Sequence, residues 1–193
     1  SLIPLPLNLK LVNEKKALSG FKTIVTDNQV LKKEALLLQQ LFKENKVSLS
    51  ITSKTAAYNN SIHLQLTNSF ENTEGYQMSV RTDGITIKAK TSAGIFYAIQ
   101  TLRQLIKDKQ IQCAEINDSP AFPFRGYMVD VGRNYQSIKL LKQQIDVMAA
   151  YKLNIFHFHL TEDIAWRLQS KRYPQLTDAK YMLRNPGKFY SLA

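Results

Sequence analysis

A short proline-rich segment, residues 117–124, divides this sequence and most limits how it can fold. It reads Asn-Asp-Ser-Pro-Ala-Phe-Pro-Phe, with two prolines, Pro120 and Pro123, in four residues. Proline fixes φ and lacks a backbone N–H, so a helix or a central strand cannot continue through such a segment. A chain of 193 residues is long enough for a small domain plus part of another. We therefore expect two parts, residues 1–118 and 119–193.

The first part mixes helical and strand patterns, which predicts an α+β domain. Apolar residues at helical spacing predict helices over residues 29–44 and from about Ser92 onward. Strands are predicted over residues 21–26, 47–52 and 62–67, after an extended segment at residues 1–10.

Two features of this first part are more specific. Asp83-Gly84 separates two alternating apolar runs and predicts a hairpin over residues 76–90, since glycine accepts a positive φ at low cost. His63 is a polar residue in a predicted strand, and we expect it at a surface position.

The second part begins with a strand, a helix and another strand. Residues 125–131 and 154–160 predict the strands, and Ser137 can cap the helix between them. The apolar face of this helix comprises Ile138, Leu141, Ile145, Met148 and Ala149. A crossover helix of this kind joins parallel strands. The second part therefore predicts a βαβ unit.

Composition excludes some classes of protein and leaves others open. Cys113 is the only cysteine, so an internal disulfide framework or a CxxC metal motif is excluded. The net charge of +11 permits anionic partners, but the basic residues are dispersed, and we expect a solvated basic surface rather than nucleic-acid binding. No apolar stretch is long enough for a membrane span.

Polar side chains follow the two predicted strands of the βαβ unit, where functional groups gather in α/β barrels. Asp130, Arg133 and Asn134 follow the first strand. His157, His159, Glu162, Asp163 and Trp166 lie in or after the second. Alternation places both histidines on one strand face and Phe156 and Phe158 on the other. An arginine with carboxylates suits a polyol, and an indole can stack on a sugar ring.

Other interpretations of the same residues stay open. The two histidines with Glu162 or Asp163 can form a metal site, although no third clear ligand is present. Asp130 and Arg133 can form a purely structural ion pair. Trp166 can belong to the core.

Residues 124–174 resemble the catalytic domain of family 20 glycoside hydrolases. Phe124-Arg125-Gly126 and Val129-Asp130-Val131-Gly132-Arg133-Asn134-Tyr135 resemble the family's first barrel strand, RGxxxDxxRHF. The segment from His157 to Arg167 resembles its HxHLTDDxxWR pattern, and Tyr173-Pro174-Gln175-Leu176 its YPxL. Residues 1–118 are similar in layout to the family's preceding α+β domain, and residues 91–98 match its sequence best.

The resemblance implies the start of a TIM (β/α)8 barrel and β-N-acetylhexosaminidase activity in a full-length enzyme. Such enzymes release terminal non-reducing N-acetylglucosamine or N-acetylgalactosamine with retention, assisted by the substrate's own acetamido group. Their catalytic Asp-Glu pair lies on the fourth barrel strand. The sequence contains no Asp-Glu dipeptide, so we expect residues 1–193 to be inactive alone.

The resemblance also assigns roles to individual residues. Arg133 maps to the arginine that binds the 3- and 4-hydroxyls of the sugar in subsite −1, and Glu162 to a residue that supports this arginine or binds a hydroxyl. Asp130, His159, Asp163 and Trp166 are implied as supporting residues. Glu162 stands where the family has Asp, and Asn134 where it has His, which puts fine specificity in doubt. No metal or other cofactor is implied.

Further expectations concern partners and location. Glycans that contain N-acetylhexosamine are the implied ligands, and the resemblance implies a periplasmic, cell-surface or secreted protein. One βαβ unit cannot close a barrel, so we expect an oligomer, a segment swap or an irregular C-terminal portion. A stand-alone carbohydrate-binding or interaction module is the alternative function.

Overall fold

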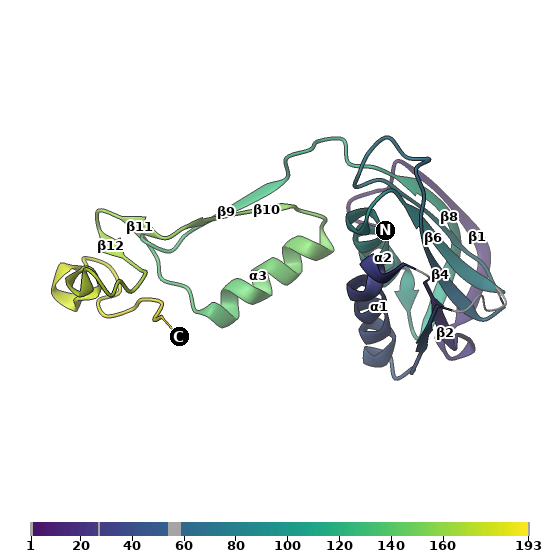
Figure 1. The fold of residues 1–193 in the computed structure, drawn as a ribbon, viewed down its shortest axis with the longest axis horizontal. Helices are drawn as coiled ribbons and strands as arrows, with labels where there is room; N and C mark the ends of the chain where they lie inside the picture. The colour runs from purple at the N-terminus through teal and green to yellow at the C-terminus, as the bar shows by residue number, and fades with distance from the viewer. Residues whose placement is uncertain (1, 27, 54–58, 193) are drawn as a thin grey trace. The chain divides into compact units, whose positions relative to one another are not determined.

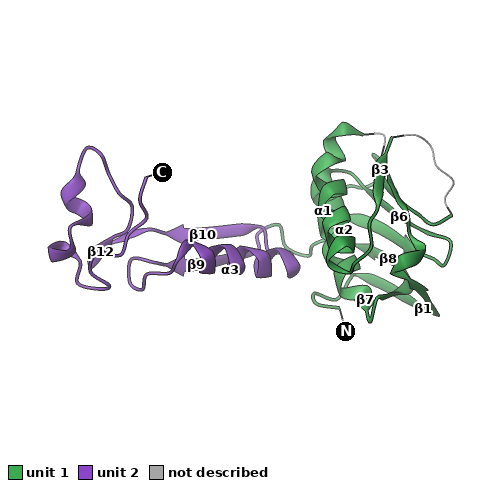
Figure 2. Ribbon diagram, turned by 90° about the horizontal axis from the view of Figure 1, so that it is seen from below, with its two compact units in different colours: residues 1–123 green, residues 124–193 purple. Residues whose placement is uncertain are grey.

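The computed structural model describes residues 2–26, 28–53 and 59–192. The chain forms two compact units, unit 1 from Ser1 to Pro123 and unit 2 from Phe124 to Ala193 (Figure 2). The division falls inside the proline-rich segment. None of the helices among the described residues has the length and apolar character that crossing a membrane requires.

Unit 1 is built on one mixed sheet. Its strands are β1 (Asn8–Ala17), β2 (Thr23–Val25), β3 (Ser50–Thr52), β4 (Ser61–Leu66), β5 (Tyr76–Val80), β6 (Gly84–Ala89), β7 (Ile106–Lys107) and β8 (Gln110–Asp118). The order is β1-β8-β5-β6-β4-β2-β3, with β7 beside β8. Strands β2, β3, β4 and β6 pair in parallel, whereas β5 pairs antiparallel with β6 and β8, and β1 antiparallel with β8.

Two helices, α1 (Lys32–Glu44) and α2 (Ser92–Leu105), cover one face of this sheet (Figure 1). Short 3-10 turns, η1 (Leu18–Gly20) and η2 (Gln29–Leu31), precede β2 and α1. The buried core lies between the helices and the sheet. Helix α2 approaches the sheet closely at Gly94, where an added Cβ would lie 2.4 Å from the carbonyl oxygen of Gly75. A larger residue at this position therefore requires the helix to shift.

The hairpin predicted at Asp83-Gly84 is confirmed, because β5 and β6 pair antiparallel and Arg81 N donates to Gly84 O. The positive φ expected at Gly84 is wrong, since Gly84 already belongs to β6. The two longest strands, β1 and β8, were not predicted. Strand β1 is mostly exposed and carries few apolar residues, so alternation gives little signal there.

The surface position expected for His63 is also wrong. His63 is 4% exposed, and its Nε2 lies 2.8 Å from Ser61 Oγ. It lies on β4, which has parallel neighbours, β2 and β6, on both sides. Strands inside a parallel sheet are buried on both faces, which alternation alone does not reveal. Burial lowers the pKa of His63.

Unit 2 begins with the predicted βαβ unit, formed by β9 (Gly126–Asp130), α3 (Ile138–Ala150) and β10 (Ile155–His159). The two strands are parallel, as predicted, and Ser137 caps α3 by accepting a hydrogen bond from Leu140 N. A small ladder of β11 (Thr161–Glu162) and β12 (Ala165–Trp166) follows. After it come only the 3-10 helices η3 (Pro174–Thr177) and η4 (Ala179–Tyr181) in the described residues.

The core of unit 2 is small. Val129, Val131, Leu141 and Tyr190 are buried in it. Phe156 and Phe158 pack against them, as predicted for the phenylalanine face. Two residues of the apolar face predicted for α3 are exposed, Ile138 at 54% and Ile145 at 45%. Two strands are too narrow to cover a helix of this length, so part of its apolar face meets solvent.

Candidate functional site

Arg133 lies in the loop after β9, and Asp130 at the end of that strand fixes it twice. The backbone N–H of Arg133 donates to Asp130 Oδ1 at 3.0 Å, and Nε of its side chain lies 3.3 Å from Asp130 Oδ2. A second carboxylate, from Glu162, lies 3.5 Å from Arg133 Nη2. The structural ion pair that the sequence left open therefore exists, and it holds both the backbone and the guanidinium of Arg133.

These residues meet because the carboxyl ends of parallel strands lie at the same edge. Asp130 is the register partner of His159, and Val131 N donates to His159 O at 3.0 Å. Glu162 on β11 then packs over the loop after β9. An added Cβ at Gly132 would lie 2.9 Å from Glu162 Cβ, so this close approach depends on glycine.

His159 completes the cluster around Glu162. Its Nε2 lies 3.1 Å from Glu162 Oε1, although the two do not have hydrogen-bond geometry. Ligand atoms of Asp130, His159 and Glu162 all lie within 4.8 Å of one another, so these three can offer ligands to a metal ion. The guanidinium of Arg133 already lies against both carboxylates, and a metal ion there would face its repulsion. The metal site left open by the sequence, both histidines with Glu162 or Asp163, differs from this group, which contains His159 and Glu162 but not His157.

The exposure of these side chains shows what the cluster can do. The Arg133 side chain is 70% exposed, whereas those of Asp130 and Glu162 are 17% and 23% exposed. The carboxylates thus lie behind the guanidinium and leave part of its donor fork facing solvent. A fixed guanidinium with unused N–H donors beside carboxylate acceptors can bind neighbouring hydroxyl groups of a polyol.

The remaining predicted residues lie nearby without joining the cluster. Asp163 is exposed in the turn between β11 and β12. Trp166 is 36% exposed, so the interpretation of it as a core residue is wrong, and its Nε1 donates to Leu168 O at 2.6 Å. His157 is exposed on the opposite side of β10 from Phe156 and Phe158.

Arg167 is the residue of this region that the residue patterns did not single out. It is fully buried, and its guanidinium donates to backbone carbonyls in the loop after β9 and in residues 184–188. Burial lowers the pKa of Arg167. In the sequence, only the resemblance of Trp166-Arg167 to the family pattern indicated Arg167. Hydrophobic periodicity does not predict a buried arginine.

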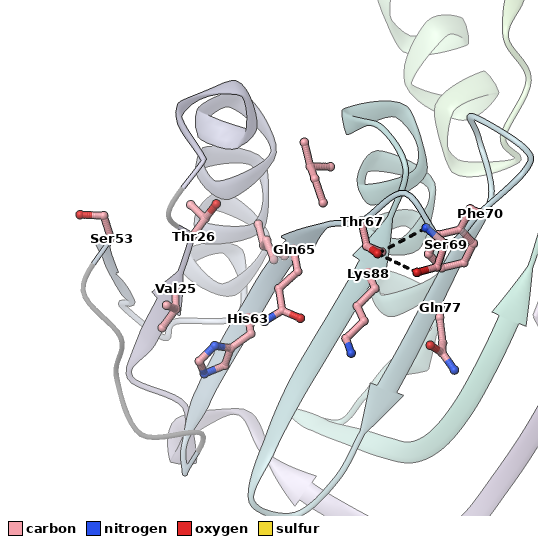
Figure 3. A pocket seen from close by; sticks show the side chains of 12 residues that line it. Val25, Thr26, Ser53, His63, Gln65, Thr67, Ser69, Phe70, Gln77 and Lys88 are labelled. Carbon is pink, nitrogen blue, oxygen red and sulfur yellow. Dashed lines mark hydrogen bonds between the residues drawn. The ribbon is translucent and has the colours of Figure 1, made fainter.

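Unit 1 has a cavity of about 500 Å³ of its own on the side of the sheet away from the helices. His63, Gln65, Gln77 and Lys88 line it from β4, β5 and β6 (Figure 3). Its lining contains one lysine and no carboxylate. It thus lacks the arginine–carboxylate arrangement found in unit 2, and it contains none of the site residues predicted from the sequence.

Comparisons with known proteins match both parts of the chain to one family. The family model "Glycosyl hydrolase family 20, domain 2" matches residues 1–119, and "Glycosyl hydrolase family 20, catalytic domain" matches residues 122–191. A beta-hexosaminidase of Porphyromonas gingivalis is 35% identical over 191 residues, which are 92% of this chain and 25% of that protein. An N,N'-diacetylchitobiase of Vibrio harveyi is 44% identical over 106 residues, which are 53% of this chain and 12% of that protein.

Solved structures of hexosaminidase-type enzymes are also similar to this chain. The β-N-acetylhexosaminidase of Bacteroides fragilis has a TM-score of 0.84 and 30% identity, covering 98% of this chain and 40% of its own. A GH20 exo-β-N-acetylglucosaminidase of Vibrio harveyi, solved in complex with N-acetylglucosamine, has a TM-score of 0.83 and 26% identity over 98% of this chain and 32% of its own. The chain spans about a quarter of the length of the Porphyromonas relative. With two family models matching in order along it, the chain belongs to glycosyl hydrolase family 20.

Proposed function

We propose that this chain is part of a β-N-acetylhexosaminidase that hydrolyses terminal non-reducing N-acetylglucosamine or N-acetylgalactosamine residues. The observation that carries the proposal is the Arg133 guanidinium, anchored by Asp130 and Glu162 at the carboxyl end of β9 and open to solvent. Family membership supports the same reaction, since beta-hexosaminidases are among the relatives. The reaction would retain the anomeric configuration by attack of the substrate's own acetamido oxygen.

In this proposal each residue of the cluster has a distinct task. Arg133 donates hydrogen bonds to the 3- and 4-hydroxyls of the sugar in subsite −1. Asp130 fixes the loop and the guanidinium, and Glu162 either supports the guanidinium or accepts from a hydroxyl. His159 supports Glu162, and its Nε2 lies 3.1 Å from Glu162 Oε1. These interactions bind and orient the sugar, but none of them transfers a proton to the glycosidic oxygen.

Two further residues extend the proposed site. Trp166, which is exposed, offers an indole face to the apolar side of a sugar ring. Asp163 is a supporting residue outside the cluster around Arg133. The chain is accordingly divided into a non-catalytic part, residues 1–118, and a sugar-binding part, residues 119–193. The acid and the acetamido-orienting carboxylate are not among these residues, because the sequence holds no Asp-Glu dipeptide.

Titration of the ¹⁵N-labelled chain with N-acetylglucosamine, followed by NMR, tests the sugar site. We expect millimolar binding that shifts the Arg133 Nε–H resonance, because few contacts anchor the sugar. Arg133→Ala should abolish binding, whereas Arg172→Ala, an equal charge change at an exposed arginine, should leave it unchanged. Sugar binding that survives Arg133→Ala would place the site elsewhere. A chromogenic N-acetylglucosaminide should show no turnover by residues 1–193, and measurable turnover would contradict the proposed absence of the acid.

The proposal extends to assembly and location. Leu140 and Val147 of α3 and Tyr151 directly after it, all exposed, line an apolar cavity of about 480 Å³ in unit 2. Such a surface favours self-association or a segment swap of this chain. Action in the periplasm, at the cell surface or outside the cell rests on the family resemblance, and cell fractionation with an antibody to the chain tests it.

A further inference from the structure

Arg167 is the largest fully buried side chain among the described residues, with an exposed fraction of 0%. A buried cation normally requires a carboxylate partner, because desolvation of the charge is costly. No acidic side chain of the described residues pairs with Arg167. Its charge is instead stabilised mainly by the dipoles of main-chain carbonyl groups, and Met182 Sδ is a further, weak acceptor 3.6 Å from Nη1.

The five N–H donors of a guanidinium are all used. Nε donates to Val131 O at 2.8 Å, and Nη2 donates to Gly132 O at 2.9 Å and to Arg184 O at 2.8 Å. Nη1 donates to Asn185 O at 3.1 Å and to Lys188 O at 2.9 Å. The acceptors belong to two segments, the loop after β9 and residues 184–188. Arg167 therefore joins two segments that are far apart in the sequence.

The first of these segments carries Arg133. Val131 O and Gly132 O, the two carbonyls immediately before it, are bound by Arg167, and Tyr135 N, two residues after it, donates to Asn185 Oδ1 at 3.0 Å. Asn185 O is itself one of the acceptors of Arg167. The backbone on both sides of Arg133 is thus attached to residues 184–188, and Arg167 holds that attachment together.

We propose that Arg167 is a positioning residue for the sugar site: its guanidinium clamps the loop 131–135 to residues 184–188 and so fixes where Arg133 points. The inference rests on the proposed role of Arg133 in sugar binding. Because the Arg133 side chain is 70% exposed, few packing contacts hold it in place. Its direction therefore depends on the loop backbone and on Asp130, and the loop backbone depends on Arg167.

Lysine keeps the positive charge of Arg167 but supplies three donors in place of five, and they do not form a planar fork. In Arg167→Lys we expect binding of N-acetylglucosamine by the full chain to weaken about tenfold, which corresponds to about 1.4 kcal/mol. We also expect the Nε–H resonance of Arg133 to move toward that of exposed arginines, because its contact with Asp130 loosens. Arg172→Lys is the matched control and should change neither quantity.

The NMR signature separates positioning from general stabilisation. A lower unfolding midpoint in Arg167→Lys with an unchanged Arg133 resonance and unchanged sugar affinity would overturn the proposal. If Arg167→Lys does not fold, Asn185→Gly replaces it, since glycine tolerates the φ of +46° at this position while removing the bond to Tyr135 N. Asn185→Gly keeps every carbonyl acceptor of Arg167, so we expect the Arg133 resonance to stay in place. A resonance that moves to the position of exposed arginines would overturn the proposal, because the bond from Tyr135 N would then fix the loop.

Failure of the proposed function gives a different result. If the unchanged chain does not bind N-acetylglucosamine at all, the sugar-binding role of Arg133 fails. The response of the Arg133 Nε–H resonance to Arg167→Lys requires no sugar and still decides whether Arg167 positions that side chain.

Discussion

Unit 1 and unit 2 are stabilised in different ways. Unit 1 buries a continuous apolar core between two helices and an eight-stranded sheet. Unit 2 buries four apolar residues in its core cluster and leaves several large apolar side chains of α3 exposed. Its most heavily bonded residue is a buried arginine rather than an apolar side chain. Directional hydrogen bonds thus contribute to holding unit 2 together, where unit 1 is held together by apolar packing.

The difference bears on the sugar site that we propose in unit 2. Apolar packing fixes the volume of a core but not the direction of an exposed polar side chain. Carboxylate and carbonyl acceptors, by contrast, fix the direction of the group that donates to them. Asp130 acts in this way on both the side chain and the backbone N–H of Arg133, whereas Arg167 binds the carbonyls of the two residues before it.

The largest effect is expected from breaking the core of unit 1. Phe42 is fully buried and packs edge-on against Phe21, with ring centroids 5.7 Å apart. Phe42→Ala should lower the stability of unit 1 by about 3–5 kcal/mol. Urea unfolding of unit 1 is followed by hydrogen exchange of its amides, and that of unit 2 by fluorescence of the single tryptophan, Trp166. We expect the Trp166 transition to stay in place, and an equal shift of both transitions would show that the two units unfold together.

An intermediate effect is expected from pH in unit 1. Burial lowers the pKa of His63 in the folded chain, whereas the unfolded value is about 6.5. Below that pH the unfolded state binds more protons than the folded state, so the stability that neutral His63 permits is lost as pH falls. The urea midpoint of unit 1 should therefore decrease from about pH 7.5 to about pH 5, an interval that includes the unfolded pKa.

His63→Gln removes this titration and should flatten the decrease, because glutamine stays neutral throughout. A slope equally steep in His63→Gln would assign the pH dependence to another group. Ser61→Ala, which removes the hydroxyl beside His63 Nε2 but leaves the imidazole, is the control that should retain a pH dependence.

The smallest change in stability is expected on α3 of unit 2. Val147 is 56% exposed and belongs to the apolar surface of that helix. Val147→Lys should change stability by less than about 0.5 kcal/mol but reduce self-association in sedimentation velocity, because the charge must be desolvated in any contact. Asp146→Asn, an equal change of charge at the neighbouring exposed position, should leave association unchanged. Equal association of the unchanged chain and of Val147→Lys would show that this surface of α3 takes no part in self-association.

Hydrophobic periodicity was sufficient where strands and helices bury one face. It predicted α1, α2, the β5–β6 hairpin and the parallel β9 and β10. It failed at β1, whose residues are mostly exposed and which is held by pairing with β8 rather than by burial. Pairing partners distant in the sequence leave no periodic signal, and for the same reason the burial of His63 in a central strand was missed.

The site was predictable in part. Placing polar residues at the carboxyl ends of two parallel strands correctly brought Asp130, Arg133 and His159 to one edge, with Glu162 beside them. The requirement for glycine at position 132 and the burial of Arg167 were not predictable, because both depend on segments that meet only in the folded chain. Residues that act through main-chain contacts have no characteristic neighbours in the sequence.

The clamp around Arg167 has a consequence for how this part of the chain can change over evolutionary time. All five of its oxygen acceptors belong to the main chain, so substituting the side chains of Arg184 or Lys188 leaves the acceptors in place. Inserting or deleting a residue between Arg167 and Arg184, however, displaces the carbonyls of Arg184, Asn185 and Lys188 together. We therefore expect this stretch to vary freely in the identity of its exposed side chains while keeping its length, so that spacing rather than residue type is what selection preserves there.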